Sequence, residues 1–118
     1  MTIETRQTNV PLSSSLRDHV NQRLGHALGR FQDRLGRARV WVEDLNGPRH
    51  GHDDKLCRIV VEVEPREQII AEATSDDPYT AVSLAVAKLH RVVRRVIDRG
   101  HWSRHGARHH RLRTVPAV

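Results

Sequence analysis

The sequence contains only one cysteine, Cys57, among its 118 residues. A single cysteine excludes an internal disulfide and a zinc site built from several cysteines. Long hydrophobic runs are also missing, because no apolar stretch approaches the roughly 18 residues that a membrane-spanning helix needs. The first ten residues lack the charged-then-apolar pattern of a signal peptide. The sequence therefore predicts one small cytoplasmic domain that makes no contact with a membrane.

Acidic residues are scarce in the last quarter of the chain. Residues 1–87 hold 11 Lys and Arg against 13 Asp and Glu, whereas residues 88–118 hold nine Lys and Arg and one acid, Asp98. The net charge of +6 therefore arises from this last segment. Such clustering favours a polyanionic partner, with nucleic acid ahead of an anionic membrane. A codon bias toward Arg would explain why only Lys55 and Lys88 are lysines, but it would not explain the clustering.

Hydrophobic periodicity predicts an α+β fold with the element order β-α-β-β-β-α. Four segments alternate apolar and polar residues, as strands covered on one face do, and two segments repeat apolar residues at helical spacing. The expected strands are residues 3–8, 37–45, 56–64 and 68–74. The expected helices begin after the N-caps Ser13 and Asp77 and end near residues 31–35 and 99. We therefore expect two helices on one face of a four-stranded sheet, resembling a double-stranded-RNA-binding domain.

The domain is expected to span residues 1–99. The second helix is expected to stop at Gly100, and residues 100–118 contain four His, four Arg and no acid. A segment with so little apolar content cannot build a core. We expect it to be a basic tail that stays disordered until it binds a partner.

The second helix carries the sharpest functional signal. Its apolar positions share one arc that faces the sheet. Nearly opposite lies a stripe of cations at spacing i, i+3, i+7 and i+11, which suits a phosphate backbone. An ordinary solvated face is the alternative, although such a face usually mixes charges of both signs. The stripe consists of Lys88, Arg91, Arg95 and Arg99.

The first helix offers a second, weaker basic stripe, because acids lie near it. If the two helices lie side by side on the sheet, the two stripes could form one continuous basic surface. The first-helix stripe consists of His19, Arg23, His26 and Arg30, with Arg17 near the opposite edge of the apolar arc.

Nine histidines raise the question of a metal site. His50 and His52 share a glycine-rich loop, and His101, His105 and His109 are spaced by four. Zinc sites normally close with four ligands in a shaped pocket, which neither a loop pair nor a mobile tail provides. We therefore expect no functional metal site and no cofactor.

Signals of catalysis are absent as well. The sequence has no Gly-rich phosphate loop, nucleophile elbow or His-Glu-x-x-His motif. Cys57 falls on the apolar face of an expected strand, which favours an inert core thiol over a nucleophile. The Asp53-Asp54 pair and the Asp76-Asp77 pair suit a loop and a helix cap better than acid-base chemistry. We expect neither an enzyme nor a small-molecule substrate.

Three segments resemble a known family when taken together. They are NVPLSSSLRDHVNQRL at the entry to the first helix, DLNGPRHGHDDKLCRIVVEV around an expected strand, and DDPYTAVSLAVAKLHRVVRR in the last helix. The chain, from about Ile3 to Arg99, resembles the bacterial ribosome hibernation-promoting factor and ribosome-associated inhibitor A family, once labelled sigma-54 modulation proteins. In the last segment the matching residues are Tyr79, Ala81, Lys88, Leu89 and Arg91.

The resemblance implies a stress-response factor that binds the small ribosomal subunit. Family members dock in the channel for messenger and transfer RNA and contact ribosomal RNA through basic residues of both helices. The free protein is expected to be monomeric. Carried over to this sequence, the contacts are Arg17, Arg23, Lys88, Arg91 and Arg95, to which the two stripes add Arg30 and Arg99.

Two departures and two alternatives accompany this resemblance. His26 stands where many relatives have Lys, and the dimerisation domain of the long members does not follow, so pairing of ribosomes by that route is not expected. One alternative is a general nucleic-acid-binding protein that acts through its basic tail. The other is a protein-interaction module that uses the sheet face around Trp41 and Val60. Trp41 and Trp102 could each stack on a base, and Trp41 could equally cover the open sheet face or join a self-association surface.

Overall fold

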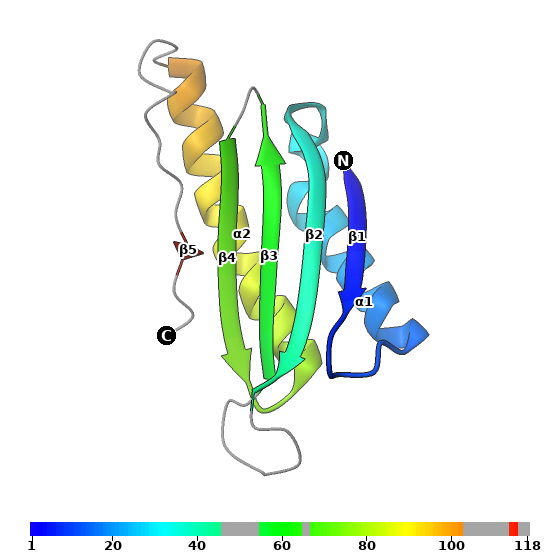
Figure 1. Ribbon diagram of the computed structural model, residues 1–118. Helices are drawn as coiled ribbons and strands as arrows, with labels where there is room; N and C mark the ends of the chain where they lie inside the picture. The colour runs from blue at the N-terminus through cyan, green and yellow to red at the C-terminus, as the bar shows by residue number, and fades with distance from the viewer. Residues whose placement is uncertain (46–54, 65–66, 103–113, 116–118) are drawn as a thin grey trace.

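The chain forms a mixed sheet with both helices on the same face (Figure 1). The computed structural model describes residues 1–45, 55–64, 67–102 and 114–115, with the backbone alone at residues 7, 100–102 and 114–115. The sheet order is β1-β2-β3-β4-β5. The strands are β1 (Thr2–Gln7), β2 (Leu35–Asp44), β3 (Lys55–Val63), β4 (Glu67–Ser75) and the two-residue β5 (Thr114–Val115). The helices are α1 (Ser14–Leu28), the 3₁₀ helix η1 (Gly29–Arg34) and α2 (Pro78–Trp102).

The predicted α+β class and element order are confirmed. Strands β2, β3 and β4 form an antiparallel meander, while β1 runs parallel to β2 at one edge and β5 runs parallel to β4 at the other. The expected stop of the second helix at Gly100 is wrong, because α2 continues to Trp102. A glycine inside a helix costs only about 1 kcal/mol relative to alanine, which the rest of a long helix can offset.

One continuous core lies between the sheet and the helices. Figure 1 shows α2 crossing behind β3 and β4, and α1 lying behind β1 and β2. The apolar stripe predicted for each helix is buried against the sheet, as are the alternate residues of the three long strands. Burial of such side chains contributes roughly 1.5–3 kcal/mol each and holds the helices in place. The most deeply buried large side chains include Leu24, Leu28, Ile59, Ile69 and Leu89.

Side-chain caps fix where the two α-helices begin, as the sequence predicts. The backbone N–H of Leu16 donates to the hydroxyl of Ser13 at 3.1 Å. The backbone N–H of Thr80 donates to the Asp77 carboxylate at 2.9 Å, one residue before the proline that opens α2. Each cap satisfies a backbone donor that the helix itself cannot pair. These two caps set the starting points from which the basic side chains of each helix are spaced.

Several sequence predictions lie outside the described residues. They are the loop histidines His50 and His52, the Asp53-Asp54 pair, and the tail residues 103–113 and 116–118. The expectations for these segments stay predictions.

Candidate nucleic-acid interface

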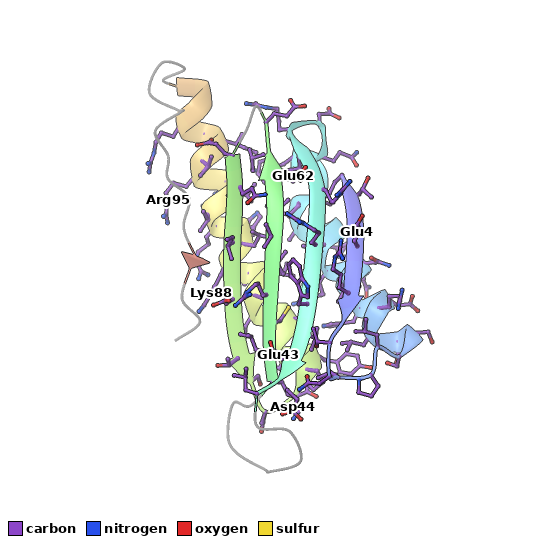
Figure 2. All side chains as sticks on the ribbon, viewed as in Figure 1. Glu4, Glu43, Asp44, Glu62, Lys88 and Arg95 are labelled. Atoms are coloured by element: carbon purple, nitrogen blue, oxygen red, sulfur yellow. The ribbon has the colours of Figure 1, made fainter. Side chains whose placement is uncertain are left out.

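The two faces of the domain differ in how their charges are paired. The sheet carries ion pairs, whereas no arginine of α1 or α2 pairs with an acid within the described part of the chain. Figure 2 shows four labelled carboxylates, Glu4, Glu43, Asp44 and Glu62, all on the sheet. The described arginines of α1 and α2 therefore carry their charge without an ion-pair partner. The sheet pairs are Arg6–Glu4 at 3.1 Å, Arg37–Glu4 at 3.6 Å, Lys55–Asp44 at 3.6 Å and Arg58–Glu72.

The cations predicted on α2 lie at its surface. Arg91, Arg95 and Arg99 are exposed, and Lys88 is half-buried. Lys88 and Arg95 project from the flank of α2 that lies beyond β4, away from α1 (Figure 2). Partial desolvation, and then the nearby charge of Arg91, lower the pKa of Lys88 below its ordinary value. Arg91 is therefore close enough to Lys88 for their like charges to interact.

Part of this stripe lines an outer hollow on α2 of about 460 Å³. Four arginines and a single acid surround it, so its field is strongly positive. Arg94 belongs to this set although the predicted stripe omits it. The lining residues are Arg91, Arg94, Arg95, Asp98 and Arg99.

A second hollow of about 380 Å³ lies between the two helices, and we call it the interhelical groove. From α1 and the start of η1 it is lined by Arg23, His26, Ala27 and Arg30. From α2 it is lined by Ser83, Val86, Ala87 and His90. No acid belongs to this lining, so the basic side chains of the groove have no opposing charge within it.

The structure brings most of the predicted RNA-binding residues into these two hollows. Arg23 and Arg30 share the interhelical groove, and Arg91, Arg95 and Arg99 share the outer hollow. Along α2, His90 is the last residue that lines the groove, and the next residue is the first that lines the outer hollow. The two hollows therefore follow one another on that helix. Arg17 and Lys88 line neither hollow, although Arg17 is exposed.

A polar network joins the two helices at one end of the groove. The Nε2 atom of His19 lies 3.1 Å from both the Tyr79 carbonyl oxygen and the Ser83 hydroxyl. The hydroxyls of Ser15 and Tyr79 lie 3.0 Å apart. Hydrogen bonds to Ser15, and secondarily to Ser13, lower the pKa of Tyr79 below its ordinary value. His19, predicted as part of a basic stripe, therefore has a structural role within the protein.

The predicted set of RNA-binding residues omits two basic side chains, one in the interhelical groove and one in the outer hollow. His90 and Arg94 both lie between the core arc and the predicted stripe of α2, four residues apart. Their spacing can be read from the sequence, but the predicted stripe includes only the cations opposite the core. The flank of α2 that carries His90 also faces a concavity because α1 lies beside it.

The described residues offer little that suits other chemistry. They contain no group of three or more His, Cys, Asp or Glu placed to hold a metal ion. Neither described helix is long and apolar enough to cross a membrane. Cys57 is fully buried, and burial raises the pKa of its thiol to about 12, so it stays protonated at neutral pH.

The open face of the sheet has a small apolar centre. The Arg39 guanidinium lies 6.0 Å from the centre of the Trp41 ring, and Val60 next to them is only 7% exposed. Trp41 is half-buried on this face, and its predicted alternatives, base stacking, covering the face and self-association, stay predictions. The side chain of Trp102 lies outside the described residues.

Sixteen chains of solved structures match this chain. A ribosomal subunit interface protein from Coxiella burnetii is 24% identical, with a TM-score of 0.65 over 80% of this chain and 96% of that one, and it supports the fold alone. The N-terminal domain of Thermus thermophilus Protein Y is 27% identical, with a TM-score of 0.66 over 80% of this chain and 98% of that one. A comparison with curated protein sequences gave no match.

The family resemblance seen in the sequence is confirmed by a family model. The model is described as "Sigma 54 modulation protein / S30EA ribosomal protein" and matches residues 3–101, which include every strand of the meander, all of α1 and all but the last residue of α2. The chain belongs to the sigma-54 modulation protein and S30EA ribosomal protein family.

Proposed function

We propose that this protein is a ribosome-associated hibernation factor that binds ribosomal RNA of the small subunit through its helical face. It occupies the decoding region and blocks the sites of messenger and transfer RNA. Membership of a ribosomal protein family supports this function. The names of two similar structures, a ribosomal subunit interface protein and Protein Y, point the same way.

The observation that carries the proposal is the contrast in charge pairing between the two faces. Three of the four described sheet arginines, Arg6, Arg37 and Arg58, pair with Glu4 or Glu72, whereas those of α1 and α2 have no acidic partner among the described residues. Unpaired cations release counterions from a phosphate backbone when they bind it, which is the main source of affinity for RNA. The helical face is therefore the surface that we assign to RNA.

The proposed action needs no chemistry beyond binding. Occluding a channel requires a folded body and a complementary charge, both of which the domain has. We propose that the protein is not an enzyme and needs no cofactor. It works in the cytoplasm, where ribosomes are found, and is monomeric when free.

Charge reversal on α2 tests the function directly. The variant K88E/R91E/R95E should lose co-sedimentation with purified small subunits, because three phosphate contacts become repulsive. The variant R6E/R37E/R58E makes the same change in net charge at exposed sites on the sheet and should keep most of the binding. Circular dichroism of both variants checks that the fold survives. Undiminished binding by K88E/R91E/R95E, or equal losses in both variants, would overturn the proposal.

A further inference from the structure

The interhelical groove has features that phosphate binding alone does not require. Three of its lining side chains are small and apolar: Ala27, Val86 and Ala87. A phosphate group gains nothing from apolar contact, whereas the face of a flat ring does. The volume of about 380 Å³ also falls within the range of small-ligand clefts, roughly 300–1,000 Å³.

Planar side chains are held in place at one end of the groove. The guanidinium of Arg30 lies 4.9 Å from the centre of the Phe31 ring, and the His90 ring lies 6.2 Å from the same ring. Phe31 is buried, so it anchors both groups from below. Guanidinium and imidazole planes are surfaces on which unstacked bases pack in protein–RNA complexes.

The opposite end and the rim supply polar groups. The Ser83 hydroxyl lines the groove and lies 3.1 Å from His19, which fixes its position. Arg23 and His26 are exposed at the rim. The apolar and planar side chains suit the flat base of a nucleotide, and the hydroxyl and basic groups suit its ribose and its phosphate.

We infer that the interhelical groove receives one unpaired nucleotide of the RNA that the helical face binds. The base lies on Ala87 between His90 and Arg30, and its phosphate lies at Arg23 on the rim. This inference rests on the proposed function and deepens it, because it gives the protein a way to recognise an unstacked base rather than phosphate charge alone. The outer hollow on α2, in contrast, offers only charge.

Filling the groove without changing its charge tests the inference. The variant A87L puts a larger side chain into the lining of the groove at an exposed helical position, and leucine is a strong helix former. Its affinity for purified small subunits should fall about tenfold, with the slope of log affinity against log salt unchanged. The control Q22L, exposed on α1 outside the groove, should bind as the wild type does. Equal affinities of A87L and Q22L for small subunits would overturn the inference.

A second measurement examines the groove separately from the ribosome. Titration of the full-length wild type with adenosine 5′-monophosphate should shift the methyl NMR signals of Ala27 and Ala87, and inorganic phosphate at equal ionic strength should not. K88E/R91E/R95E should keep this response, and A87L should lose the shift of the Ala27 methyl signal, the reporter that this variant retains. If the nucleotide leaves both methyl signals unchanged, the inference is wrong even where the proposed function holds. A nucleotide response in the groove, combined with full subunit affinity of A87L, would assign the groove to free nucleotides and also overturn the inference.

Discussion

The imidazole of His19 in α1 lies 3.1 Å, through Nε2, from the hydroxyl of Ser83 in α2. The same nitrogen lies 3.1 Å from the Tyr79 carbonyl oxygen, and the His19 and Tyr79 rings meet edge to face at 5.2 Å. These contacts join residues about 60 positions apart and help to set the spacing of the two helices. The interhelical groove begins directly beside them.

Replacing His19 with alanine should therefore destabilise the protein. Loss of the shared hydrogen bond and of the ring contact should lower the free energy of unfolding by about 1–2 kcal/mol. Urea denaturation followed by circular dichroism measures this change. H26A is the matched control, because His26 is exposed on the same helix, and its effect should stay within about 0.5 kcal/mol. Equal stability of H19A and H26A would show that the network does not hold the helices.

Two leucines on α2 provide a test of the core. Leu89 is fully buried against the sheet, while Leu84 is 45% exposed. L89A should lower the free energy of unfolding by about 2–5 kcal/mol, because it leaves a cavity in the core. L84A removes the same atoms from the surface and should change it by less than about 1 kcal/mol. A shift in the urea midpoint of similar size in both variants would contradict the orientation of α2.

Local patterns in the sequence were sufficient to predict most of the fold. The alternation of β3 and the helical spacing of α2 each correctly identified the buried face, because those patterns reflect one element against one core. The caps at Ser13 and Asp77 were also predictable, since capping depends on neighbours three residues away. These features require no knowledge of distant contacts.

What the sequence missed depends on how separate elements meet. The parallel direction of β1 and the pairing of β5 with β4 are set by chain reversal and edge pairing, which periodicity does not encode. The interhelical groove requires small side chains on both helices to face each other across the same gap. His90 gains its place there only because α1 packs beside α2. The functional role of the predicted basic residues stays a prediction.

The single thiol should be unreactive in the folded protein. Cys57 is buried and its pKa is raised to about 12 from an ordinary 9.0, so the folded state keeps the thiol proton in a pH range where the unfolded chain loses it. Stability should therefore fall between about pH 9 and 12, with a limiting slope near 1.4 kcal/mol per pH unit beyond that of C57A. Urea denaturation of both proteins measures the difference. At pH 8 iodoacetamide should label Cys57 only after unfolding, and rapid labelling of the native protein would refute its burial.

The salt dependence of ribosome binding should report the number of phosphate contacts. With about five contacts, log affinity should fall with log salt concentration at a slope of about −3 to −5. Filter binding to small subunits across a range of potassium chloride concentrations measures this slope. R91A should make the slope shallower by nearly one, because one contact is lost. A slope near zero would favour a protein contact, such as one at the sheet face around Trp41, over an electrostatic grip on RNA.

Removal of residues 103–118, which also takes away the two-residue edge strand β5, should separate binding by the rest of the folded domain from binding by the basic tail. This segment carries four arginines and no acid, so on charge alone it could bind nucleic acid without the domain. If the helical face is the specific surface, the affinity of the truncated protein for small subunits should stay within about tenfold of the wild-type value. The reason is that α2 keeps its four arginines, Arg91, Arg94, Arg95 and Arg99. Its affinity for unrelated RNA should fall more, because tail contacts are sequence-independent. Parallel titrations with small subunits and with a random RNA of matched length give the ratio of the two affinities. A truncated protein that loses nearly all subunit binding would instead assign recognition to the tail, and the arginines of the helices would then act only as a solvated surface.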